Sequence, residues 1–194
     1  SMNRAYLLYE QWGFVPSYYV CINELVLEQF AEDISQLDMP RFVNFNRRSY
    51  FPEVEEDENL MYLRLGLKLK DQFSGDVTDT ILSGGTVTFA CLQLAYFMGF
   101  DEVIVIGMDH NFVEKGVPNT TEARQSEQDE SHCHPNYFPK GTKWQLPDLY
   151  RSELAYAMAR QYYEMDGRRI LDATVGGKCD VFTKVDFKSL FLNN

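Results

Sequence analysis

The sequence predicts an α/β protein, a three-layer α/β/α sandwich around a mostly parallel sheet. Helical and strand-like segments alternate along the 194 residues, which is typical of parallel strands joined by helices. The clearest unit is residues 83–112, where a glycine turn and an apolar helix precede a second glycine turn and a strand. Polar residues follow that strand, at the sheet edge where α/β proteins bind ligands.

The amino-terminal part of the chain shows this alternation first. We expect a helix over residues 3–12 and a strand over residues 16–23, which is rich in apolar and aromatic side chains. Asn23 can cap the helix that follows. Residues 41–45 form a second short strand candidate. The helix residues whose spacing predicts a buried face are Leu25, Leu27, Phe30, Ala31 and Ile34.

Within residues 83–112, apolar residues at three- and four-residue spacing predict a helix that stops at Gly99. Residues 101–107 predict a strand, and its β-branched run without alternation favours burial on both faces. The turn Ser83-Gly84-Gly85 can present backbone N–H groups and a hydroxyl to an anion at the helix N-terminus. The helix residues at that spacing are Val87, Cys91, Leu94, Ala95 and Met98.

The remaining segments have weaker patterns. Residues 47–79, with an acidic cluster at 53–58, are interpreted as a surface excursion, and residues 111–147 as a long polar loop. Residues 149–165 predict an amphipathic helix and residues 169–171 a last strand. An apolar clamp is expected at the C-terminus, over 185–191. The predicted apolar face of the long helix contains Leu154, Ala157, Met158 and Tyr162.

Composition narrows the class of protein. A chain with 45% hydrophobic and 14% aromatic residues suits one globular domain, residues 1–194. The net charge of −11 argues against nucleic-acid binding, which needs a Lys/Arg excess. Widely spaced cysteines and the lack of a long apolar run favour a cytoplasmic protein with free thiols. His132, Cys133 and His134 lack a CxxC partner, so no metal site is expected.

Three segments carry a resemblance to a known family: AYFMGFDEVIVIGMDHNF, SHCHPNYF and GRRILDATVGGKCDVFTKVDFKSLF. They resemble the MptE-like family over essentially the whole chain. Its archaeal members are 6-hydroxymethylpterin diphosphokinases, and its bacterial members often accompany surface-glycan or flagellin-glycosylation genes. The family is similar in fold to the bacterial sialyltransferases that use a CMP-sugar. The resemblance implies a single Rossmann-like domain without the family's first strand and glycine-rich phosphate loop.

The resemblance also implies roles for individual residues. His132 resembles the general base of the sialyltransferases, with His134 as its rival, and Asp109 matches the aspartate of the Gly-x-Asp motif. His110 and Asn111 are expected beside the same pocket, and Asn111 stands where the sialyltransferases have a tyrosine. The residues expected to contact the nucleotide are Asn3, Asn23, Ser83, Gly84 and Gly85.

Together these features favour a nucleotide-dependent transferase, glycosyltransferase-like and active in surface-glycan synthesis, that needs no cofactor. One alternative is pyrophosphoryl transfer from ATP to a hydroxymethylpterin, with Mg²⁺ held by carboxylates such as Asp109. Another is a domain that binds a nucleotide or a partner without catalysis. The expected partners are a nucleotide or nucleotide-sugar and the glycan-assembly machinery. A second copy of the chain is also expected, because an incomplete sheet leaves an edge uncovered.

Overall fold

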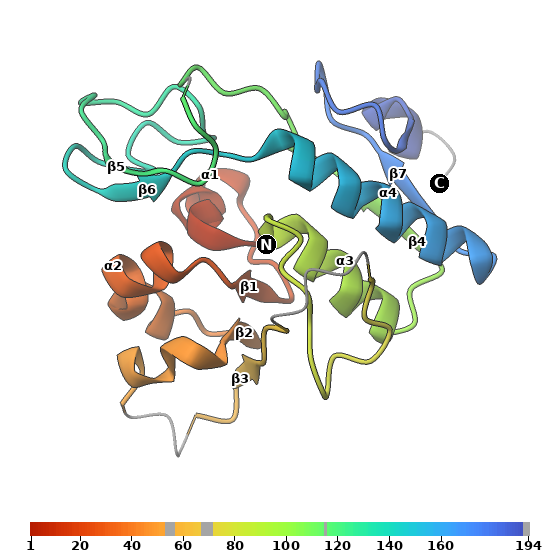
Figure 1. Ribbon diagram of the computed structural model, residues 1–194, viewed down its shortest axis with the longest axis horizontal. Coiled ribbons are helices and arrows are strands. Elements are labelled where there is room, and N and C mark those ends of the chain that lie inside the picture. Colours follow the sequence, from red (N-terminus) through yellow and green to blue (C-terminus); the bar gives the residue numbers. More distant parts are fainter. Residues whose placement is uncertain (53–56, 67–71, 115, 192–194) are drawn as a thin grey trace.

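The computed structural model describes residues 1–52, 57–66, 72–114 and 116–191, and shows a mixed α/β fold with mostly parallel strands in small sheets (Figure 1). One sheet has the order β1-β2-β3 and another β4-β7-β8, both parallel, while β5 and β6 pair antiparallel. The strands are β1 (Tyr19–Cys21), β2 (Arg41–Asn44), β3 (Leu60–Leu63), β4 (Glu102–Val105), β5 (Thr121–Ala123), β6 (Lys143–Gln145), β7 (Arg169–Asp172) and β8 (Thr183–Lys184).

Local sequence signals place the longer helices well. The prediction is confirmed for α4 at both ends and for α3 to within one residue. The predicted cap of α2 is also confirmed, because Asn23 Oδ1 accepts the Leu25 and Val26 N–H groups at 3.0 and 3.2 Å. The described helical elements are η1 (Asn3–Leu8), α1 (Tyr9–Trp12), α2 (Glu24–Ser35), η2 (Phe45–Tyr50), α3 (Val87–Phe97), α4 (Leu149–Met165) and η4 (Phe187–Phe191).

The amino-terminal helix differs from its prediction. Instead of one helix over 3–12, a 3₁₀ helix is followed by a single α turn. The reason lies in the backbone, since Asn3 has φ 47° and Arg4 has non-helical angles of −92° and 22°. Arg4 is buried at this break, which places a charged side chain inside the molecule.

The interpretation of residues 47–79 as a surface excursion is wrong at β3. This strand pairs in parallel with β2, with Leu60 opposite Arg41 and Leu63 opposite Asn44. Both ends of β3 are buried, while its middle is half-buried. Four residues are too short for a clear period-two pattern, which explains the miss. Residues 53–56 and 67–71, with most of the acidic cluster and part of the apolar segment after it, lie outside the described residues.

The expectation that the strand after α3 is covered on both faces is also wrong. Along β4 the side chains alternate between exposed and half-buried, and Ile104 is 37% exposed. Within the described residues β4 pairs with β7 and with no strand on its other side. The run of β-branched residues therefore predicts the strand correctly here, but it does not predict that both faces of the strand are buried.

The buried face of α4 is not the predicted one. Leu154, Ala157 and Tyr162 are exposed. The buried face of α4 combines three small side chains with two tyrosines. The buried residues of α4 are Ser152, Ala155, Tyr156, Ala159 and Tyr163. The predicted C-terminal clamp is wrong too, because η4 has no buried residue.

Helix α3 lies between the two parallel sheets (Figure 1). On one side Phe89 and Leu92 pack among side chains of α4 and β7, and on the other Ala90 and Leu94 pack against β1 and β2. The buried side chain of Gln93 hydrogen-bonds the segment before α3, residues 74–82, to this helix. Its Oε1 accepts the N–H groups of residues 74 and 82 at 3.0 and 3.1 Å, and its Nε2 donates to the carbonyls of residues 82 and 89 at 2.8 and 3.1 Å.

The glycine turn before α3 is held by close packing. A Cβ atom on Gly84 would lie 2.5 Å from the Phe89 ring and 2.7 Å from Ala155 Cβ, and the φ of Gly84 is 54°. Both facts require glycine at this position. The turn is thereby fixed against α3 and α4. None of the helices among the described residues has the length and apolar character needed to cross a lipid bilayer.

Candidate functional site

The strongest candidate site centres on a buried carboxylate and a histidine three residues later. His132 Nδ1 lies 3.0 and 2.9 Å from the two carboxylate oxygens of Asp129, whose side chain is 0% exposed. A carboxylate only accepts hydrogen bonds when ionised, so Nδ1 carries the proton. His132 Nε2 makes no hydrogen bond within the described residues and is left with its lone pair. This arrangement is that of a general base held by an acid.

Several groups keep Asp129 ionised. Burial raises the pKa of Asp129. The hydrogen bond from His132, the Ser131 N–H and the charge of Arg124 outweigh that effect, so the pKa lies below its ordinary value. The Ser131 and Phe138 N–H groups donate to the carboxylate at 3.0 and 3.2 Å. The carboxylate is therefore an anion at neutral pH.

Arg124 supplies the nearest fixed positive charge. Its Nη2 lies 3.2 Å from Asp129 Oδ1 and its Nη1 lies 2.6 Å from Glu114 Oε1. The Ser131 hydroxyl donates to the other oxygen of Glu114. Arg124 follows β5 directly, and its N–H donates to the Thr142 carbonyl at 2.9 Å, which extends the ladder with β6. The hairpin thus directs this side chain into the loop.

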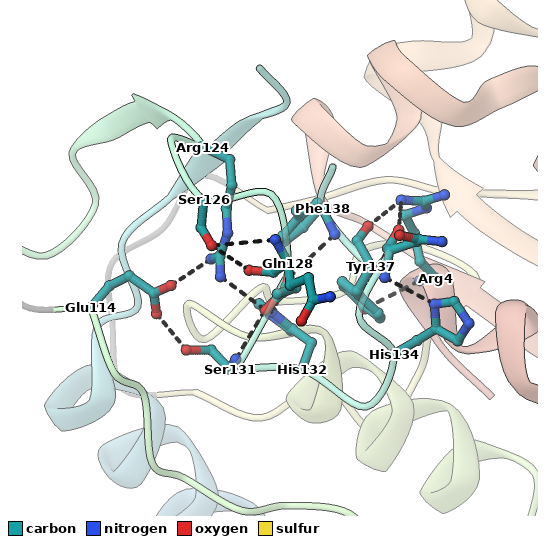
Figure 2. A network of polar contacts seen from close by, with 12 residues as sticks. Arg4, Glu114, Arg124, Ser126, Gln128, Ser131, His132, His134, Tyr137 and Phe138 are labelled. Carbon is teal, nitrogen blue, oxygen red and sulfur yellow. Dashed lines mark hydrogen bonds and ion pairs between the residues drawn. The ribbon is translucent and has the colours of Figure 1, made fainter. Parts of the chain in front are cut away.

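Aromatic side chains surround the His132 ring. Tyr137 stacks on it with ring centroids 4.4 Å apart and an interplanar angle of 3°, while Phe112 and Phe138 contact its edges. Tyr137 is itself held by Arg4, whose N–H donates to the Tyr137 hydroxyl at 3.2 Å and whose guanidinium donates to its carbonyl. Figure 2 shows this network, with Glu114 and Arg124 at one end and Arg4 at the other.

His134 has the opposite hydrogen bonding. Its Nδ1 accepts the N–H of Asn136 at 3.0 Å, so this nitrogen is unprotonated and the proton of the neutral ring is on Nε2 (Figure 2). A ring in that tautomer offers no free lone pair at Nε2. Hydrogen bonding therefore favours His132 over His134 as the base.

The Ser83-Gly84-Gly85 turn lies at the start of α3. The Ser83 hydroxyl makes no hydrogen bond within the described residues, and its carbonyl accepts the Thr86 N–H at 2.9 Å. Arg151 covers Gly85, because a Cβ there would lie 3.0 Å from Arg151 Cδ. Thr86 caps α3 by accepting the N–H of residue 88 at 3.3 Å, which occupies part of the helix N-terminus.

The residues after β4 lie beside this turn and beside His132. His110 has φ 52°, and its Nε2 lies 3.0 Å from Glu153 Oε1 on α4. Its ring lies 6.3 Å from that of Tyr156, whose hydroxyl is 3.2 Å from Thr86 Oγ1. Asp109 and Asn111 are exposed.

The segment of Asp109 lies near the loop that contains Cys133 and His132. Burial raises the pKa of the Cys133 thiol, and the nearby carboxylates of Asp129 and Asp109 raise it further. The ring of Phe112, three residues after Asp109, contacts the His132 ring at 5.7 Å between centroids, so the segment after β4 lies beside the loop of His132. The charge at the end of β4 and the candidate base belong to one neighbourhood.

The two predicted asparagines differ in how much of each side chain remains available. Asn23 uses its Oδ1 to cap α2. Asn3 Oδ1 is buried and has no hydrogen-bond partner within the described residues. Asn3 also precedes Arg4, so it lies beside the residue that holds Tyr137. Of the two, Asn3 keeps the acceptor that a ligand could use.

The structure therefore brings some predicted residues together and leaves others apart. The loop of His132 meets the Asn3 segment through Tyr137 and the segment after β4 through the ring of Phe112, while His110 meets the Ser83 turn through Tyr156 of α4. No hydrogen bond or ring contact joins Ser83 or Asn23 to His132 within the described residues.

Sequence reasoning missed Asp129 and Arg124. The spacing of Asp129 three residues before His132 is a usable signal, since a short turn can bring the two side chains together. Arg124 gave no such signal, because its side chain reaches the loop only through hairpin pairing. Among the described residues, no group of three His, Cys, Asp or Glu side chains has an arrangement that can hold a metal ion.

Comparison with known proteins adds no relative. No protein-family model matches the chain, and no curated protein or solved structure matches it significantly.

Proposed function

We propose that this protein is a nucleotide-dependent transferase of the glycosyltransferase type, with His132 as its general base. The observation that carries the proposal is the pairing of His132 Nδ1 with the buried Asp129 carboxylate, at 2.9 and 3.0 Å. It leaves Nε2 with a lone pair that can accept the proton of an acceptor hydroxyl. Proton transfer of this kind contributes about 10²–10⁴-fold to a rate.

The proposed reaction uses that proton acceptor once in each turnover. His132 Nε2 takes the hydroxyl proton while the acceptor oxygen bonds to the anomeric carbon of the donor sugar. The bond from that carbon to the phosphate oxygen breaks, and the nucleotide leaves with the electron pair. Donors near the departing phosphate stabilise its charge. Ser83, with a hydroxyl unused by the described residues, is the proposed donor at the α3 N-terminus.

The proposal includes a Rossmann-like three-layer arrangement like that of the MptE-like family. Two observations support it: all strand pairs within both three-stranded sheets are parallel, and α3 packs against side chains from both. In such folds the ligand lies at the carboxyl ends of the strands. The segment of Asp109 and His110 follows the carboxyl end of β4, and Asn23 follows that of β1.

Pyrophosphoryl transfer from ATP is the weaker candidate. It needs Mg²⁺ held by carboxylates, and Asp109 would be its first ligand. The described residues gather no further ligands of that kind around Asp109. The pairing of His132 with the buried Asp129 carboxylate favours chemistry centred on an imidazole base.

Ligand binding tests the proposal. We expect calorimetry with CMP, CDP, UDP, GDP and ATP to show metal-independent binding of a cytidine or uridine nucleotide. Ser83→Ala should weaken it about 10- to 100-fold, because a hydrogen bond to a charged group contributes about 1.5–3 kcal/mol. The matched control is Ser35→Ala, at the far end of α2 from Asn23.

Three outcomes would count against the proposal. Binding of ATP that requires Mg²⁺ would favour the diphosphokinase reaction. Equal effects of Ser83→Ala and Ser35→Ala would remove the Ser83 turn from the site. A complete lack of binding would leave the chain without the nucleotide site on which the proposal rests.

A further inference from the structure

We propose that Arg124 is a positioning residue, which holds His132 in the tautomer that has a free Nε2. The β5–β6 hairpin is the element that presents it. The catalytic meaning of this assignment rests on the proposed function, whereas the assignment itself concerns only the state of the imidazole and is testable without any substrate.

The position of Arg124 supports the assignment. Its side chain is 3% exposed and its guanidinium bridges two carboxylates, Asp129 on one side and Glu114 on the other. Its Nε and Nη1 are buried and make no hydrogen bond within the described residues, so the contact of Nη1 with Glu114 is an ion pair. The side chain therefore contacts both carboxylates through its charge, while two of its own donor nitrogens make no hydrogen bond within the described residues.

The charge of Arg124 has a direct effect on Asp129. A fully buried carboxylate without a fixed positive charge takes up a proton or turns toward water. Either change would remove the anion that accepts the Nδ1–H of His132. The Ser131 and Phe138 N–H groups would remain as donors to the carboxylate, but they are neutral. Arg124 is thus the permanent charge of the network.

Arginine suits this task better than lysine. Its planar fork places Nη1 on Glu114 and Nη2 on Asp129 at the same time, and one ammonium group does not span two carboxylates in this way. The guanidinium also lies over the ring of Trp144, with its central carbon 5.2 Å from the centroid. Glu114 completes the support, since it also accepts the Ser131 hydroxyl next to His132.

Nuclear magnetic resonance of the imidazole nitrogens tests the assignment. The chain has three histidines, so ¹⁵N-histidine labelling gives three ring systems that single substitutions can assign. At about pH 8, above the ordinary histidine pKa of about 6.5, we expect His132 with a protonated Nδ1 and His134 with a protonated Nε2. Arg124→Met should convert His132 to a mixture of both tautomers and leave His134 unchanged.

Two further variants complete the design. Arg160→Met is the control, because Arg160 forms an exposed ion pair with Glu164 at 2.7 Å on α4. Its spectrum should match that of the wild type. Arg124→Gln keeps a polar side chain with N–H donors but removes the charge, and serves if Arg124→Met does not fold by circular dichroism. It should give the same tautomer mixture.

The possible results distinguish a wrong assignment of Arg124 from a wrong proposed function. A folded Arg124 variant in which His132 keeps a single protonated Nδ1 would overturn the assignment. So would unfolding of both Arg124 variants, because the arginine would then be a stability residue. If the tautomer changes as expected but no nucleotide binds, the proposed transferase function fails while the role of Arg124 toward His132 stands.

Discussion

The loop segment 129–138 contains two histidines, two residues apart, with opposite hydrogen bonding. His132 donates through Nδ1 to the buried Asp129 carboxylate, whereas His134 accepts the Asn136 N–H through Nδ1. The first ring is left with a lone pair at Nε2, and the second with a proton there. The tautomer of a histidine is thus set by the atom that faces Nδ1, and these two imidazoles in one loop carry their proton on different ring nitrogens.

The largest effect should separate the two histidines in catalysis. We expect His132→Gln to lower donor turnover about 10²–10⁴-fold, because it removes the base. His134→Gln should lower it less than about tenfold, since the His134 Nε2 already carries a proton. The measurement is nucleotide release from a CMP- or UDP-sugar. Equal losses in the two variants would show that the hydrogen bonding at Nδ1 does not assign the base.

A smaller effect should appear in stability. Asp129→Asn keeps the side-chain volume but removes one of the two carboxylates that the buried Arg124 bridges, so we expect it to lower the free energy of unfolding by about 2–4 kcal/mol. The matched control is Glu153→Gln, in a His pair of the same length whose carboxylate is 47% exposed. It should cost less than about 1 kcal/mol. Urea unfolding measures both, and similar values would mean that the buried network adds little.

The smallest expected effect is the change in the free energy of unfolding at low pH. The pKa of folded Asp129 lies below its ordinary value of about 3.9, so its contribution is fully present above that value. The contribution is lost as the pH falls through the folded-state pKa. The difference in unfolding free energy between wild type and Asp129→Asn should therefore shrink below about pH 4. A difference that stays constant between about pH 5 and pH 2.5 would contradict this prediction.

Much of the fold follows from local signals in the sequence. The bounds of α4, nearly those of α3, and the Asn23 cap were predictable because helix periodicity and capping act over a few residues. The exposure of β4 and the buried face of α4 were not. Both depend on which element lies opposite, and Ala155 faces α3 because a small side chain permits close approach.

The candidate site was predictable in part. His132 was named from a resemblance, and the hydrogen bonding now favours it over His134. Asp129 was missed because an acidic residue in a polar stretch gives no sign that it is 0% exposed. Arg124 was missed for a related reason, since it reaches the loop through the pairing of β5 with β6. Buried charge is a property of the tertiary structure and leaves little trace in composition.

Gly84 has a consequence for which substitutions the protein tolerates. The ring of Phe89 and the methyl of Ala155 already occupy the space that a side chain at position 84 would need. In a random library, we expect this position to accept no other residue, while the exposed positions of α3 and α4 vary widely. The absence of a side chain at position 84 thus sets how closely α3 and α4 approach each other here. A larger residue at this position would push the two helices apart.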